Sequence, residues 1–148
     1  MSIPAGDHSP ALRVVWPIEA LGTIATEAGY RTALVLVVDR AGDFDRRLLK
    51  SGLAERLARS GVELFALVGV GAEHAHDALD WVLEEAGADH VLTSWHGEHD
   101  PEDVASFVVA TSRGNSLTRI VAAVDVGTEL GATLRDRIAE TIEAYADE

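Results

Sequence analysis

A chain of 148 residues that is 47% hydrophobic and 25% charged has the size and composition of one globular domain, which excludes a disordered protein. It has no cysteine, so disulfides, a thiolate nucleophile and a cysteine-ligated zinc are excluded, and its net charge of −13 opposes binding to nucleic acid or anionic lipid. Since it has neither a signal-peptide pattern nor an 18-residue apolar run, we expect one cytoplasmic domain over residues 1–148, with residues 1–10 flexible.

Strand patterns and helix patterns alternate along the chain. Four strands are predicted, at 32–38, 62–70, 90–95 and 119–126, and a short one at 12–16 would add a fifth. The first is a continuous run of β-branched residues and leucine, as expected for a strand covered on both faces. The helices are predicted from the i, i+3, i+4 spacing of apolar residues: 17–28, 44–59, 75–86, 101 onward and 129–145. We expect Asp43 and Asp100 to cap two of these helices, the second with Pro101 in its first turn.

This alternation predicts a three-layer α/β domain. Short connections between strands and helices imply right-handed crossovers and an open, mostly parallel sheet of four or five strands, Rossmann-like or flavodoxin-like, with helices on both faces. The residues expected to be buried on the strands are Leu34, Leu36, Val68, Leu92, Val121 and Ala123.

Ligands of such a sheet bind beyond the carboxyl ends of its strands. The side chains that follow or end the predicted strands there include Asp39, Trp95, His96 and Asp125, which together form the candidate site. Imidazoles and carboxylates suit a first-row metal, with His96 and His99 as alternative ligands, but no spacing matches a known metal motif. In the other interpretation the histidines are solvated loop residues, and no metal or cofactor is bound.

The segment Gly69-Val70-Gly71 after the second predicted strand admits two interpretations. It resembles the start of a dinucleotide-binding turn, but His74 stands where the third glycine belongs, so we favour a plain tight connection between strand and helix over a nucleotide site. A P-loop and a nucleophile elbow are missing, and the single lysine, Lys50, lies in a helix rather than after a late strand. The incomplete motifs favour a role without catalysis.

Charge is distributed unevenly along the chain. Residues 60–112 contain no lysine or arginine, whereas the predicted helix at 44–59 is rich in both. Trp81 lies off the apolar stripe of its helix, among acidic residues. This helix face is a candidate surface for a partner protein, and its residues are His74, Asp77, Trp81 and Glu85. In the alternative interpretation, Trp81 covers a neighbouring loop.

One segment carries a resemblance. The run Thr93-Ser94-Trp95-His96, followed by an acid-rich turn and a helix with Phe107, resembles a family of small uncharacterised bacterial Rossmann-like proteins in which a strand ends in Thr-Thr-Trp-His. The similarity extends over residues 32–125. It implies the α/β fold, assigns no activity, and marks Trp95 and His96.

Two functions follow as hypotheses. The first is a non-catalytic binding or regulatory module, for example a defence- or immunity-associated one, whose partner is another protein or a second copy, with no nucleic acid and no membrane. The alternative is a small enzyme, or a sensor of a ligand or metal, that uses the crevice at the carboxyl edge of the sheet.

Overall fold

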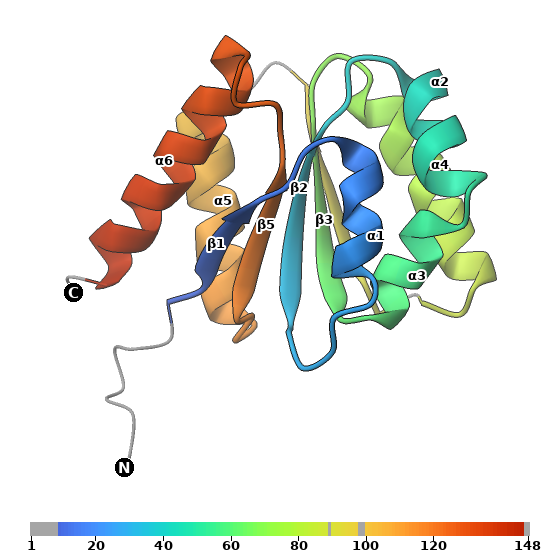
Figure 1. Cartoon of the computed structure of the whole chain (residues 1–148), viewed down its shortest axis with the longest axis horizontal. Coiled ribbons are helices and arrows are strands. Elements are labelled where there is room, and N and C mark those ends of the chain that lie inside the picture. Colours follow the sequence, from blue (N-terminus) through green and yellow to red (C-terminus); the bar gives the residue numbers. More distant parts are fainter. Residues whose placement is uncertain (1–8, 89, 98–99, 147–148) are drawn as a thin grey trace.

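The computed structural model describes residues 9–88, 90–97 and 100–146 (Figure 1). The prediction of a flexible segment at residues 1–10 therefore falls largely outside the described residues. In chain order the helices and strands are β1 (Ala11–Val14), α1 (Leu21–Ile24), β2 (Thr32–Val37), α2 (Ala41–Phe44), α3 (Leu53–Arg59), β3 (Val62–Val68), α4 (Ala72–Glu85), β4 (Leu92–His96), α5 (Pro101–Gly114), β5 (Arg119–Ala123) and α6 (Glu129–Ala146).

The strands form one five-stranded sheet in the order β1-β5-β2-β3-β4, and every neighbouring pair is parallel. This confirms the predicted fold class. It also answers the question left open at the N-terminus, because residues 11–14 pair with β5 as a fifth strand. No described helix has the length and apolar content needed to cross a membrane.

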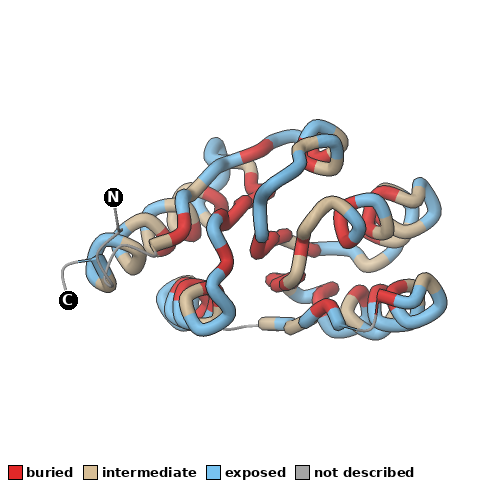
Figure 2. Tube along the Cα trace, turned by 90° about the horizontal axis from the view of Figure 1, so that it is seen from below, coloured by how far each residue is buried: buried red, intermediate tan, exposed pale blue. Residues whose placement is uncertain are grey.

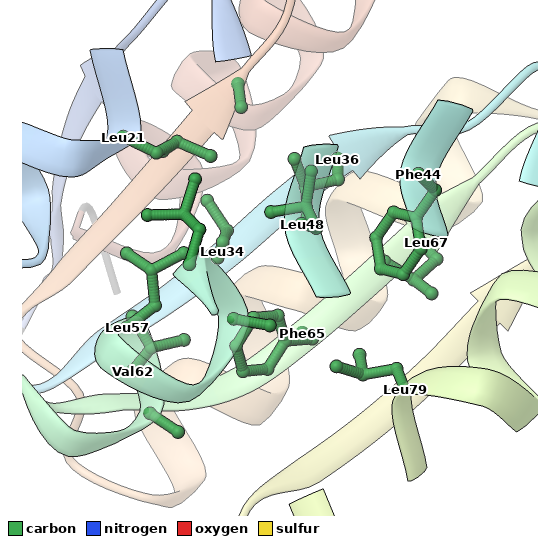
Figure 3. Close-up of a cluster of buried hydrophobic side chains, with 14 of the residues drawn as sticks. Leu21, Leu34, Leu36, Phe44, Leu48, Leu57, Val62, Phe65, Leu67 and Leu79 are labelled. Atoms are coloured by element: carbon green, nitrogen blue, oxygen red, sulfur yellow. The ribbon is translucent and has the colours of Figure 1, made fainter. Parts of the chain in front are cut away.

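Helices cover the two faces of the sheet as separate layers, with α1 to α4 on one face and α5 and α6 on the other (Figure 1). Side chains alternate along each strand, so β2 sends Leu34 and Leu36 into the first layer and Ala33 and Val35 into the second. Figure 3 shows the first of these cores, in which Phe65 lies among leucines from the sheet and the helices. Buried residues concentrate along the strands and the inner faces of the helices (Figure 2).

The predicted helix at 44–59 is broken, which corrects the sequence interpretation. α2 passes into a π-helical turn at 45–49, and α3 begins only after Gly52, whose φ is +78°. Ser51 Oγ accepts a hydrogen bond from the Leu53 N–H at 3.2 Å and so satisfies a donor at the break. Asp43 does not cap this helix, because it lies inside α2, whereas Asp100 caps α5 as predicted by accepting from the Glu102 N–H.

A second correction concerns β4. Leu92 was expected in the core, but it is 46% exposed, whereas the other residues expected to be buried are below a tenth exposed. The reason is the place of β4 at the edge of the sheet, where the flanking helices leave part of the strand uncovered.

The amino end of the sheet carries an ion network that the sequence pattern did not reveal. Arg119, at the start of β5, is only 5% exposed and donates to Glu27 at 2.8 Å, and Arg13 donates to both oxygens of the same carboxylate. Hydrogen bonds from Arg13 and then Arg119 hold the pKa of Glu27 below its usual value. The Arg119 guanidinium also lies over the ring of Tyr30, 3.9 Å from its centroid.

Candidate functional site

Three neighbouring strands bring side chains together at the carboxyl edge of the sheet. Trp16 follows β1, Asp125 follows β5 and Asp39 follows β2, and these strands are adjacent in the sheet order. They line a cavity of about 340 Å³, which we call the crevice. Its lining residues are Trp16, Val37, Asp39, Asp125, Thr128, Leu130 and Gly131.

The crevice lies where the direction of the chain connections changes. The helices that follow β1 and β2 pack on one face of the sheet, while α6, which follows the intervening β5, packs on the other. When two neighbouring strands are followed by connections on opposite faces of the sheet, neither connection passes over the carboxyl ends of both strands. A depression therefore remains between these two ends. Ligands of open α/β sheets bind in depressions of this kind.

One wall of the crevice is the turn between β5 and α6, which is held by its own hydrogen bonds. Asp125 Oδ1 accepts from the Gly127 N–H at 2.9 Å. The Thr128 hydroxyl donates to the Asp125 carbonyl at 2.6 Å and accepts from the Gly131 N–H at 3.1 Å. Gly131 has no room for a side chain, because a Cβ there would lie 2.0 Å from the Asp125 carbonyl oxygen. The Asp125 carboxylate is therefore presented from a rigid turn.

The opposite wall consists of Trp16 and Asp39. Trp16 is 45% exposed, and Asp39 has no hydrogen bond or ion pair with any described residue. Both residues also line a smaller cavity of about 120 Å³, on whose rim Arg40 and Arg47 lie. Arg47 is bound to both oxygens of Glu19, and this hydrogen bonding lowers the pKa of Glu19. Arg40 is the cation of this rim that has no ion-pair partner within the described residues.

The structure brings together only part of the predicted site. Asp39 and Asp125 line the same crevice, but Trp95 and His96 belong to β4, which β3 separates from β2. The His96 ring packs at 5.1 Å from that of Phe107 on α5, and its Nε2 lies 3.0 Å from Ser94 Oγ. The four residues therefore lie in two separate places on the carboxyl edge.

Trp16 is the residue of the crevice that sequence reasoning missed. A signal was present, because Trp16 ends the short predicted strand at 12–16 and is followed by Pro17, which ends a strand. Its use required knowing that this strand belongs to the sheet and lies beside β5.

The described histidines at the carboxyl edge do not form a metal-binding cluster. His99 lies outside the described residues, and among the described ones no group of three or more histidines and carboxylates could hold a metal ion. His76 instead contacts β4, with its Nε2 3.0 Å from Thr93 Oγ1 and 3.4 Å from Asp80 Oδ2.

The two glycines after β3 pack against protein backbone. A Cβ on Gly69, whose φ is +127°, would lie 2.5 Å from the Val38 carbonyl oxygen, and one on Gly71 would lie 2.9 Å from the Ala41 nitrogen. The backbone at the end of β2 and in the turn after it therefore packs directly against both glycines. These contacts favour the interpretation of a tight connection over that of a nucleotide turn.

The predicted partner surface on α4 is solvent-exposed. His74, Asp77, Trp81 and Glu85 are all exposed, and Trp81 is 65% exposed. This large exposed fraction does not fit the alternative in which Trp81 covers a neighbouring loop. A role for this surface in binding a partner stays a prediction.

Comparison with known proteins gives a family and no activity. The model of a family described as a domain of unknown function (DUF7684) matches residues 15–144, a range that includes Trp16, Asp39 and Asp125. No curated protein and no solved structure matches the chain. The predicted resemblance to an uncharacterised family is thus confirmed, over a longer range than 32–125, while the Thr-Thr-Trp-His motif stays a prediction.

Proposed function

Because the chain belongs to the DUF7684 family, whose description assigns no activity, we propose from its geometry that it is a non-catalytic binding module that holds a small organic cation in the crevice. The observation that carries this proposal is the lining of the cavity: one exposed indole and two carboxylates, from three different strand ends, with no lysine or arginine. A cytoplasmic location and a bacterial source stay predictions.

The charges of the crevice favour a cation over an anion. Asp39 and Asp125 both line it, whereas Arg40 and Arg47 line the smaller cavity that shares Trp16 and Asp39 with the crevice. A guanidinium or amidinium group can donate hydrogen bonds to two carboxylates and place its flat face on an indole ring. Trp16 supplies that ring, and Val37 and Leu130 supply apolar contacts for the rest of the ligand.

The side chains of the crevice favour binding rather than catalysis. The only hydroxyl in the lining belongs to Thr128, and both its donor and an acceptor position are used within the turn. A nucleophilic hydroxyl must donate to a neighbouring base, whereas the Thr128 hydroxyl donates to the backbone carbonyl of Asp125, which is not a base. The hypothesis of a small enzyme therefore has less support here than that of a ligand-binding module.

The proposal is tested by calorimetric titration with three flat molecules of similar shape: benzamidine, which is cationic, benzamide, which is neutral, and benzoate, which is anionic. We expect binding of benzamidine alone. Asp39→Asn and Asp125→Asn should each weaken it about tenfold, the equivalent of ~1.4 kcal/mol. Asp125→Asn keeps the oxygen that accepts from Gly127, so the turn should stay intact.

Asp136→Asn, on the exposed face of α6, is the matched control and should leave benzamidine binding unchanged. Trp16→Leu should weaken binding while the melting temperature stays close to that of the unmodified chain, because the indole is half-exposed. Equal binding of benzamide and benzamidine, or full binding by Asp39→Asn, would show that the carboxylates do not select a cation and would refute the proposal.

A further inference from the structure

β4 leaves one edge of the sheet open, at the side remote from the crevice. It pairs with β3 alone among the described strands. The His96 carbonyl accepts from the Gly69 N–H at 3.0 Å and so points toward β3. Since the backbone groups of a strand alternate in direction, those of Thr93 and Trp95 point away from β3, to the side where no described strand pairs with β4.

A groove runs beside this open edge, between α4 and β4. Its volume is about 390 Å³, and its lining is apolar at the base and acidic at the rim: Asp80, Leu83, Glu84, Ala88, Val91, Leu92 and Thr93. Exposed apolar side chains lie on both faces of this edge, because Leu92 is exposed on one face and Trp95 is 42% exposed on the other. An unpaired strand with exposed apolar side chains can accept one more strand.

The edge lacks the features that usually prevent strand addition. β4 contains no lysine, no proline and no bulge. The charged residues that line the groove, Asp80 and Glu84, are both acidic, and residues 60–112 of the sequence have no lysine or arginine. Of the described acidic residues in that range, only Glu63 is paired with an arginine, Arg31. Two copies joined along this edge would bring acidic side chains together, so electrostatic repulsion disfavours self-association. The same negative charge attracts a basic segment of another chain.

We propose that the β4 edge and its groove bind an extended, basic segment of a partner protein by strand addition. The backbone of that segment pairs with Thr93 and Trp95. Its lysines and arginines reach Asp80 and Glu84 on the α4 side of the sheet, and its apolar side chains lie against Leu92 on the α5 side. This surface is separate from the crevice and does not depend on the ligand proposed for it.

The probe is a fluorescent eight-residue peptide of alternating lysine and valine, compared with a peptide of alternating glutamate and valine. Fluorescence anisotropy should show saturable binding of the lysine peptide alone, weakened by added salt. The double substitution Asp80→Lys, Glu84→Lys should weaken binding at least tenfold. The matched control, Glu140→Lys with Glu143→Lys on α6, makes the same change in net charge and should leave most of the binding intact.

Amide hydrogen exchange distinguishes strand addition from mere charge attraction. Peptide binding should slow exchange at the Thr93 and Trp95 amides and leave that of Ser94, which points toward β3, nearly unchanged. Trp95→Pro, which removes an outward N–H, should weaken binding more than Trp95→Ala, while Trp81→Ala on the outer face of α4 should have no effect. Circular dichroism melting verifies that each variant is folded.

Three results would overturn the proposal. The first is equal binding of the acidic peptide, and the second is unchanged exchange at Thr93 and Trp95 when the lysine peptide is saturating. The third is sedimentation of the chain as a dimer that Trp95→Pro dissociates, since this would make a second copy the occupant of the edge.

Discussion

Gly131 and Gly22 both lie in helices, but their surroundings differ in a way that decides what a methyl group would do. A Cβ on Gly131 would overlap the Asp125 carbonyl oxygen, and a Cβ on Gly22 would meet no atom within 4 Å. The first glycine is therefore required by close packing of backbone in the wall of the crevice. The second is a position where the helix merely tolerates a glycine.

Alanine substitutions at these two positions should shift stability in opposite directions. Gly131→Ala must move the turn after β5, so we expect a loss of about 1–3 kcal/mol, as in overpacked sites, together with weaker benzamidine binding. Gly22→Ala should be neutral or stabilise the protein by up to about 1 kcal/mol, because alanine favours helix. Denaturant unfolding of the two variants measures both effects, and an unchanged midpoint for Gly131→Ala would contradict the packing argument.

At the scale of whole elements, β2 and β4 show how the place of a strand in the sheet determines how far its residues are buried. β2 lies between β5 and β3, and its residues from Thr32 to Leu36 are buried. β4 lies at the edge, and none of its residues is fully buried. β2 is an almost unbroken apolar run, TALVLV, whereas β4, LTSWH, has three polar residues among its five, and these compositions accord with a central and an edge place in the sheet.

A matched pair of leucines tests this difference. Leu36→Ala on β2 removes a fully buried side chain and should lower the free energy of unfolding by about 2–5 kcal/mol. Leu92→Ala on β4 removes a half-exposed one and should cost less than about 1 kcal/mol. Urea unfolding followed by circular dichroism gives both values. Equal losses for the two variants would mean that β4 is covered in solution, for example by a second copy.

The charge of the molecule as a whole is strongly negative, and its one basic segment is largely neutralised. Within residues 44–59, most cations form ion pairs with nearby carboxylates, and Arg56 is the cation without such a partner in the described part of the chain. The pairs are Arg46–Asp43, Arg47–Glu19, Lys50–Asp45 and Arg59–Glu55. The net charge of −13 already opposes binding to phosphate backbones. The ion pairs add a second reason, because they neutralise most cations of the basic segment.

We therefore expect no gel shift of duplex DNA by micromolar protein at moderate salt. Binding to a phosphate backbone depends on unpaired lysines and arginines, and it weakens steeply as salt rises. A salt-sensitive shift would contradict this expectation. In that case, loss of the shift in Arg56→Ala with Arg59→Ala would locate the contact on α3.

Much of the architecture could be predicted from the sequence because its causes are local. The spacing of apolar residues determines which segments are strands and which are helices, and the alternation of the two implies a parallel sheet with helices on both faces. The cap at Asp100 depends on a residue and its near neighbours and was predicted correctly. The break at Gly52 was missed because the apolar spacing continues across it.

The tertiary structure alone decided the order of the strands and, with it, the sites. Consecutive strands β1 and β2 are separated by β5, so Trp16 meets Asp39 and Asp125, while Trp95 and His96 lie beyond β3. The continuous apolar run of β2 is typical of a strand covered on both faces, but no short-range pattern shows which strands are its neighbours. Strand order is determined by how the helices on the two faces pack together, and these contacts join residues far apart in the chain.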